Sequence, residues 1–385
     1  MTVTPPGPPA PLPLTVLTGF LGAGKTTLLN HLLRDPALAD TVVIVNEFGE
    51  IGLDHLLIET VADDMILLSA GCLCCTVRGD LIATLEDLLR RRDNGRITPF
   101  KRVVIETTGL ADPAPILHAL LYHPYLSMRY ALEGIVTVVD AVNGPATLDA
   151  HEEALKQAAV ADRLVVTKAD LLGEEASERL AALRARLRAL NPGAPIIEAV
   201  NGAAPASALV GSGLFDLEGK IADVRAWLKA EAVEAAERRD HDHRHAPHDH
   251  DHDHRHHDVN RHDERIRAFV LTSDRPIGRG AFDLFLDLLR SAHGPKLLRV
   301  KGLVDLAEEP DRPVVIHGVQ HVVHVPALLP RWPDEDRRSR LVFIVKDLDK
   351  AFVERLWRAF LGEPAIDEPD AAALADNPLA LPRGS

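Results

Sequence analysis

The chain has 385 residues, of which 46% are hydrophobic, so it can form two or three domains with substantial cores. Its formal net charge of −14 argues against a general binder of nucleic acids or anionic membranes, because such binders need a basic face. No signal-peptide pattern and no apolar run of the ~20 residues that span a membrane is evident, so we expect a cytoplasmic protein. The chain has only three cysteines, all within residues 71–75, which favours a reduced metal-binding or reactive cluster over a disulfide framework.

The first part of the chain alternates between apolar runs and segments of helical spacing. Residues 1–13 are rich in proline and are expected to form a flexible tail. We predict strands at residues 14–17, 41–46, 65–68, 102–105, 134–139, 164–166 and 195–200, and helices at residues 27–33, 78–92 and 218–239. This alternation predicts an α/β domain over residues 14–239, with a mostly parallel sheet, helices on both faces, and ligands at the carboxyl ends of the strands.

The composition changes abruptly at residues 240–258, which contain nine histidines and six aspartates but no large apolar residue. Such a segment cannot bury a core, so residues 240–263 are expected to form a disordered linker. A second, smaller α+β domain with a mainly antiparallel sheet is predicted over residues 264–362, followed by a tail over 363–385. Its expected strands are 266–271, 297–306, 313–316, 321–325 and 341–345, and its expected helices are 281–292 and 350–361.

A glycine-rich stretch, TGFLGAGKTT at residues 18–27, follows the first predicted strand. In this pattern glycines let backbone N–H groups cradle phosphates, the lysine reaches the outer phosphates, and the next threonine binds Mg²⁺. Because a strand precedes the stretch and a helix follows it, the pattern indicates a P-loop rather than a chance glycine-rich turn. The residues expected to contact a nucleoside triphosphate are Gly19, Gly22, Ala23, Gly24, Lys25, Thr26 and Thr27.

An acidic residue, Glu106, follows the strand predicted at residues 102–105, and Gly109 comes shortly after it. A carboxylate in this place can hold Mg²⁺ through its shell, and Gly109 can bring a backbone N–H to the γ-phosphate. Residues 106–113 are therefore a candidate switch that senses the γ-phosphate, and a helix N-cap within them is compatible with that role. Lys25, Thr26 and Glu106 are the expected catalytic groups.

The run TKAD at residues 167–170 follows the next buried strand and has the arrangement of a guanine-reading loop. Asp170 can accept hydrogen bonds from N1–H and the 2-amino group of guanine, while the stem of Lys168 lies along the base. Adenine would leave the carboxylate unpaired, and such sites discriminate by up to ~10⁴-fold. Many GTPases carry asparagine where this chain has Thr167, so we expect the loss of an amide that ties this loop to the phosphate loop. The sequence thus predicts GTP rather than ATP.

The three cysteines lie between a predicted strand and a predicted helix, in the run GCLCC. In an extended segment Cys72 and Cys74 project to the same side, and Cys75 can fold in at the start of the helix. Three thiolates suit Zn²⁺, Co²⁺ or Cu⁺. Closed structural zinc sites have four protein ligands, so three thiolates completed by a carboxylate or water suit an exchangeable ion. The alternative, that these are small buried hydrophobic residues, is disfavoured by their clustering.

Histidines are concentrated in the tract over residues 240–258. Its neutral imidazoles and carboxylates can bind several divalent ions weakly, which makes it a candidate metal-collecting arm, and a solvated linker is the alternative. In the second predicted domain, His317, His321 and His324 are interpreted as ordinary surface histidines.

Taken together, these motifs resemble the CobW family of P-loop GTPases, which is related to the GTPases that deliver nickel to hydrogenase and urease. The resemblance extends from residue 14 to about residue 361. It rests on residues 19–27, 46–50, 71–75, 106–113, 167–170 and 298–302. It implies a metallochaperone or metal insertase whose metal affinity depends on Mg²⁺ and GTP.

The resemblance also assigns metal ligands. Cys72, Cys74 and Cys75 match the metal motif of the family, and Glu47 and Glu50 match its acidic switch-like loop near the nucleotide and the metal. Some relatives carry one more acid just before that loop, at a position where this chain has Val45.

The expected function is GTP-dependent transport of zinc or cobalt, released to an apo-metalloenzyme or a metal-inserting client on hydrolysis. We also expect the nucleotide and the metal to be coupled through residues 46–50 and 72–75. The alternative is a metal-storing or metal-sensing protein in which GTP only sets the conformation. A small-molecule kinase is disfavoured because no arginine-rich lid is evident, no nucleic-acid or membrane partner is expected, and a homo-oligomer is left open.

Overall fold

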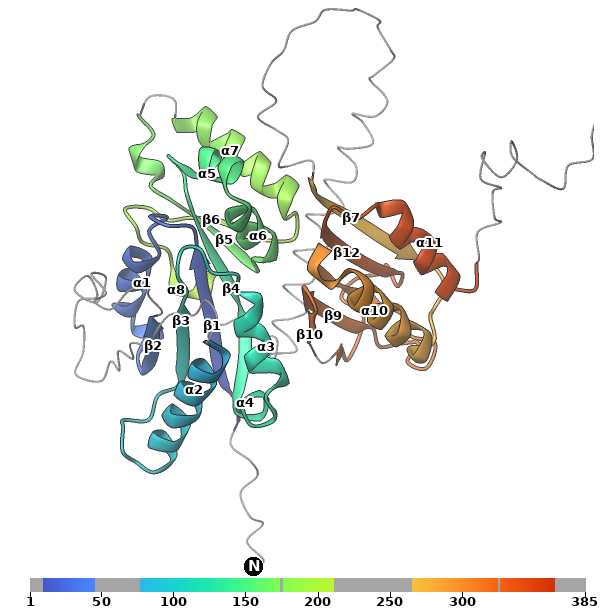
Figure 1. Cartoon of the computed structure of the whole chain (residues 1–385), viewed down its shortest axis with the longest axis horizontal. Helices are drawn as coiled ribbons and strands as arrows, with labels where there is room; N and C mark the ends of the chain where they lie inside the picture. The colour runs from blue at the N-terminus through green and yellow to red at the C-terminus, as the bar shows by residue number, and fades with distance from the viewer. Residues whose placement is uncertain (1–9, 46–76, 174–175, 211–264, 325, 364–385) are drawn as a thin grey trace, which may run out of the picture.

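The structure is a computed structural model that describes residues 10–45, 77–173, 176–210, 265–324 and 326–363 (Figure 1). The predictions for the strand at residues 65–68, the helix at 218–239, the histidine tract and the greater part of both tails fall outside these residues.

The first domain is built on a six-stranded sheet in the order β2-β3-β1-β4-β5-β6, and every pairing in it is parallel. This confirms the parallel sheet that the alternation of apolar runs predicts. Its strands are β1 (Leu12–Gly19), β2 (Thr41–Val45), β3 (Arg102–Glu106), β4 (Tyr130–Asp140), β5 (Arg163–Thr167) and β6 (Ile196–Glu198). Strand β1 begins two residues before its predicted start at residue 14, so the last two residues of the predicted tail belong to the strand.

Helices cover both faces of this sheet. They are α1 (Lys25–Leu33), α2 (Val77–Asp93), α3 (Ala114–Tyr122), α4 (Pro124–Arg129), α5 (Gly144–Ala150), α6 (Glu152–Val160), α7 (Ala176–Leu190) and α8 (Ala206–Leu209). Strand side chains alternate between two cores, because successive residues of a strand point to opposite faces. In β2, Val42 and Ile44 join the core with α2, α3, α6 and α7, whereas Val43 and Val45 join the core with α1 and α8.

The second domain has an antiparallel sheet in the order β10-β9-β8-β12-β7, with β11 paired to β9. Its elements are β7 (Ile266–Ser273), α10 (Arg279–His293), β8 (Leu297–Val304), β9 (Val314–Val319), β10 (Val322–Val323), β11 (Ala327–Leu328), β12 (Ser339–Lys346) and α11 (Lys350–Phe360). Helices α10 and α11 cover one face of the sheet (Figure 1). Between them, Phe285 and Trp357 meet with ring centroids 5.1 Å apart. The predicted α+β architecture is thereby confirmed.

The other face of this second sheet packs in part on the first domain. Leu298 of β8, Val319 of β9 and Ile344 of β12 belong to the same apolar core as α3, α6 and the parallel strands. The two domains therefore share a continuous core, and their relative placement is stabilised by buried apolar surface as well as by polar contacts.

A buried ionic network lies in this interface. Arg299 of β8 donates to the carbonyl oxygen of Val160, at the end of α6, and to the carboxylate of Asp162. The Nε2 atom of His317 lies 2.9 Å from Arg299 and 3.5 Å from the same carboxylate, and Lys301 lies 3.3 Å from it. Although burial raises the pKa of Asp162, the charges of Arg299 and Lys301 and a hydrogen bond from the backbone N–H of Ile135 outweigh it and hold that pKa well below its usual range.

The interpretation of His317 and His324 as surface histidines is wrong. They are only 4% and 9% exposed, and their rings stack with centroids 4.7 Å apart. Burial lowers the pKa of His317 well below its usual range, so the ring is neutral. The sequence predicted exposed histidines because the local pattern cannot show that the first domain covers this end of β9.

Candidate nucleotide site

The phosphate loop joins the end of β1 to the start of α1. Gly22 and Gly24 have φ values of +71° and +94°, which lie in the left-handed region that favours glycine. The ammonium group of Lys25 donates to the carbonyl oxygens of Gly19 and Phe20, at 2.9 and 3.2 Å, so it lies against the loop. The strand, loop and helix that the sequence predicts are all present.

Thr26 and Glu106 come together beside this loop, as expected from the sequence. Strands β1 and β3 are neighbours, with Leu17 opposite Glu106, and the hydroxyl of Thr26 donates to Oε1 of Glu106 at 2.8 Å. Hydroxyl and carboxylate oxygens are the hard ligands that Mg²⁺ prefers, so this pair fits the ion.

Within the predicted switch, residues 106–113, the loop that follows β3 lies directly against the phosphate loop. This loop, residues 107–113, is called the switch loop below. A Cβ atom placed on Gly109 would stand 2.5 Å from the backbone nitrogen of Leu21, so only glycine fits this contact. The hydroxyl of Thr107 donates to that of Thr18 at 2.8 Å, which anchors the start of the switch loop to β1. The backbone of Gly109 is thus held beside the position that the sequence assigns to the γ-phosphate.

The loop predicted to read guanine, residues 167–170, is joined to the phosphate loop through two side chains. The hydroxyl of Thr167 donates to the carbonyl oxygen of Ala23 at 2.7 Å, and the ammonium of Lys168 donates to that of Gly22 at 2.7 Å. Threonine at position 167 was expected to remove the contact between this loop and the phosphate loop. That expectation is wrong, because the Thr167 hydroxyl makes a hydrogen bond to the phosphate loop in place of an amide. Asp170, in a short 3-10 helix (Ala169–Leu171), is exposed and available to a base.

Asp140, which ends β4 next to this loop, was not among the residues predicted from the sequence. Its Oδ2 accepts hydrogen bonds from Lys168 at 2.7 Å and from the amide of Asn143 at 3.0 Å. Burial raises the pKa of Asp140, but these bonds outweigh it and lower the pKa below its usual value, so the carboxylate is ionised. Its position directly after the strand predicted at residues 134–139 is the feature of the sequence that could have identified Asp140.

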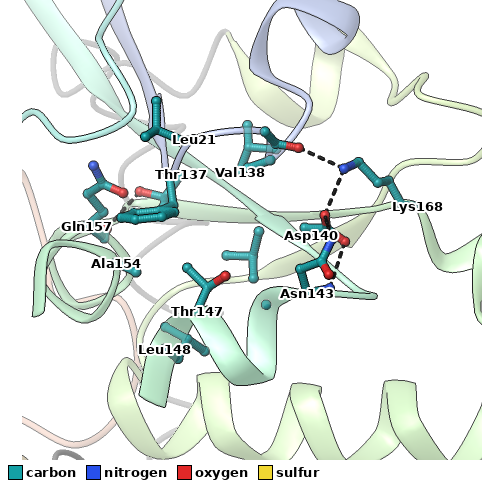
Figure 2. Close-up of a pocket in the computed structure, with 15 residues that line it drawn as sticks. Leu21, Thr137, Val138, Asp140, Asn143, Thr147, Leu148, Ala154, Gln157 and Lys168 are labelled. Carbon is teal, nitrogen blue, oxygen red and sulfur yellow. Dashed lines mark hydrogen bonds and ion pairs between the residues drawn. The ribbon is translucent and has the colours of Figure 1, made fainter. Parts of the chain in front are cut away.

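A cavity of about 240 Å³ opens beside the phosphate loop (Figure 2). It is bounded by Leu21, by Asp140 and Lys168, and by Thr147 and Gln157 from the two helices that follow β4. Gln157 was also not predicted from the sequence. It and Lys156 are the two polar residues in the otherwise apolar run from Ala154 to Val160.

Replacement of Asp170 by asparagine tests the base assignment. The amide loses a charge-assisted acceptor, so GTP binding should weaken by about 1.5–3 kcal/mol while xanthine nucleotides gain affinity. Isothermal titration of GTP, XTP and ATP measures this, with Asp283→Asn on α10 as the control. Equal affinity of the unmodified protein for GTP and ATP would contradict the assignment.

The proposed metal ligands Cys72, Cys74, Cys75, Glu47 and Glu50 lie outside the described residues. Val45 is 3% exposed in the core beneath α1, so this position contributes no ligand. Among the residues that the structure describes, no cluster of three or more His, Cys, Asp or Glu side chains could hold a metal ion. No helix in those same ranges is long and apolar enough to cross a membrane.

Comparison with known proteins agrees with this arrangement. Residues 13–198 match the CobW/HypB/UreG nucleotide-binding domain, and residues 266–361 match the cobalamin synthesis protein CobW C-terminal domain. Zinc chaperone YjiA of Escherichia coli (strain K12) is 34% identical over 352 residues, which cover 91% of this chain and 98% of YjiA. Zinc-regulated GTPase metalloprotein activator 1 of Schizosaccharomyces pombe is 39% identical over 199 residues, covering 50% of this chain and 46% of that protein.

The crystal structure of Zn(II)-bound YjiA GTPase from E. coli is also similar, with a TM-score of 0.65 and 29% identity. The match covers 91% of this chain and 99% of the YjiA chain. Both domains and their order are thus shared with a relative along nearly its whole length. The chain belongs to the CobW family of GTPases.

Proposed function

We propose that this chain is a GTP-dependent zinc chaperone, which binds the ion at Cys72, Cys74 and Cys75 and passes it to a client protein when GTP is hydrolysed. The observation that carries the proposal is the pairing of Thr26 with Glu106 beside a phosphate loop that is tied to the guanine-reading loop. The names of the relatives support zinc as the cargo rather than cobalt, since YjiA and CobW of a Sinorhizobium species are both named zinc chaperones.

In this proposal the nucleotide groups have separate roles. Lys25 contacts the β- and γ-phosphates, Thr26 and Glu106 hold Mg²⁺, and Asp170 reads the base. The bound ion supplies positive charge that offsets the charge of the transferring phosphoryl group. Gly109 offers its backbone N–H to the γ-phosphate, so the switch loop distinguishes GTP from GDP.

The positions of the flanking elements support a link between nucleotide and cargo. Val45, the last residue of β2, lies opposite Glu106 of β3, so β2 ends one strand away from the Mg²⁺ pair, and residues 46–50 follow it in the sequence. At the other end, α2 begins at Val77, two residues after Cys75. A γ-phosphate that orders one loop could thereby bring the carboxylates and thiolates into tetrahedral reach.

The test is whether zinc affinity depends on the nucleotide. We expect zinc to bind more tightly with Mg²⁺ and a non-hydrolysable GTP analogue than with GDP, and a coupling of ~3 kcal/mol would correspond to ~150-fold. By linkage, zinc must raise the affinity for the GTP analogue by the same factor. A competition titration against a calibrated chelator measures both directions, and parallel titrations with Co²⁺ decide between the two metals.

One double variant and one functional assay complete the test. Cys74→Ser with Cys75→Ser should abolish the coupling and spare nucleotide binding, because hydroxyls are poor ligands for soft ions. Identical zinc affinities in the two nucleotide states would refute coupled release. Coupled binding without GTP-dependent transfer to an apo-metalloenzyme would favour the storage or sensing alternative.

A further inference from the structure

Gln157 of α6 holds the switch loop from within the first domain. Its Nε2 donates to the carbonyl oxygens of Gly109 and Ala111, at 3.2 and 3.0 Å. Gln157 is 1% exposed, and its backbone carbonyl oxygen accepts a hydrogen bond from the hydroxyl of Thr137 at 2.8 Å, which fixes this part of α6 against β4. Water cannot readily replace this buried amide, so a movement of the loop away from α6 must break both bonds.

Gln320 of the second domain holds the same loop from outside. It occupies the tight connection between β9 and β10 with a φ of +52°, and its backbone N–H donates to the carbonyl oxygen of Leu298 at 3.1 Å. Its side-chain Nε2 donates to Oδ2 of Asp112 at 2.8 Å, while Oδ1 of Asp112 accepts from the N–H of Ala114 at the start of α3. The second domain therefore touches the switch loop directly.

Helix α6 provides a second connection between the switch loop and the second domain. Gln157 lies in the last turns of this helix. Arg299 of the second domain donates hydrogen bonds to the carbonyl oxygen of Val160, at the end of the helix, and to the carboxylate of the nearby Asp162. The switch loop is thus attached to the C-terminal sheet both through Asp112 and through α6.

From these contacts we propose that Gln320 is a positioning residue, which holds the switch loop against the phosphate loop so that the second domain favours GTP over GDP. Gly109 already lies against the backbone of Leu21 in this arrangement. A loop that is held in place loses less conformational entropy when the γ-phosphate binds it, whereas GDP has no γ-phosphate and gains nothing. By linkage, GTP strengthens the contact between the domains.

The proposal rests on nucleotide binding alone, so it can be tested in the full chain without metal. Gln320→Ala should lower the ratio of GTP-analogue affinity to GDP affinity about 10-fold, with the GDP affinity unchanged, which lies within the usual range of coupling between sites. Gln320→Glu should lower the ratio at least as much, because its carboxylate faces that of Asp112. In an Asp112→Ala background, Gln320→Ala should have no further effect, since their shared hydrogen bond is already absent.

The matched control is Tyr122→Phe, which removes another contact between the domains, the 3.2 Å hydrogen bond from Arg290 to the Tyr122 hydroxyl, without touching the switch loop. It should leave the affinity ratio unchanged. An unchanged ratio in Gln320→Ala, or an equal loss for GTP analogue and GDP, would overturn the proposal. The same conclusion would follow if Tyr122→Phe lowered the ratio as much as Gln320→Ala. Thermal unfolding by circular dichroism confirms that each variant is folded.

Discussion

Replacing Arg299 with alanine should lower the free energy of unfolding by about 3–5 kcal/mol, because it leaves the buried carboxylate of Asp162 without its main partner. The guanidinium also donates to the carbonyl oxygen of Val160, which loses that hydrogen bond as well. Urea unfolding followed by circular dichroism measures the change. Arg338→Ala is the control, since the Arg338 side chain is 52% exposed in its ion pair with Asp336 and contributes at most about 1 kcal/mol.

The double variant Arg299→Ala with Asp162→Ala separates charge from packing. If the uncompensated carboxylate causes most of the loss, the second substitution should recover part of the stability. A double variant that is less stable than Arg299→Ala alone would instead show that the lost packing and hydrogen bonds dominate.

The same network predicts the direction of the pH dependence. The lowered pKa of Asp162 contributes stability that is present above the unfolded value of about 3.9 and is lost as the pH falls below it. In Arg299→Ala the carboxyl group should protonate more readily, so the stability difference from the unmodified protein should shrink in acid. A difference that stays constant from pH 7 to pH 3 would contradict the ionic account.

We expect Gly109→Ala to reduce the rate of GTP hydrolysis by ~10²-fold or more at saturating nucleotide. The added Cβ would lie 2.5 Å from the nitrogen of Leu21, so either the switch loop or the phosphate loop must move. A displacement of about 1 Å at a reacting centre is enough for a loss of this size. Phosphate release under Mg²⁺ and saturating GTP measures it.

The control for this substitution is Gly280→Ala in α10. A Cβ there would meet nothing within 4 Å, so the change should leave hydrolysis unaltered and stabilise the helix slightly. Hydrolysis at the unmodified rate in a folded Gly109→Ala protein would show that the switch loop does not need its present contact with the phosphate loop.

Much of the first domain could be predicted because its signals are local. Strand β2 is apolar at every position from Val42 to Val45, which is typical of a parallel strand buried on both faces. Strand β4 begins at Tyr130, four residues before its predicted start at Gly134. Its register against β1 shifts between Leu14 and Thr15, opposite that glycine, and the side chain of Asp162 lies 3.2 Å from where a Cβ would stand. Gly134, which was predicted to begin the strand, instead lies within it at a place where the Asp162 side chain packs closely against the backbone.

The nucleotide site likewise combines local features, which the sequence predicts, with contacts between distant residues, which it does not. The sequence by itself located the phosphate loop, the acid at the end of β3 and the loop at residues 167–170, because each needs fixed residue types at fixed spacing around one strand end. It could not determine that the Thr167 hydroxyl bonds to Ala23, that Asp140 pairs with Lys168, or that Gln157 and Gln320 hold the switch loop. Those partners are up to 208 positions apart in the chain. The parallel sheet brings Thr167 to Ala23 and Asp140 to Lys168, because β1, β4 and β5 are neighbouring strands. The packing of α6 and of the second sheet brings Gln157 and Gln320 to the switch loop, since side chains this distant in the chain meet only where buried apolar surface fixes the elements that carry them.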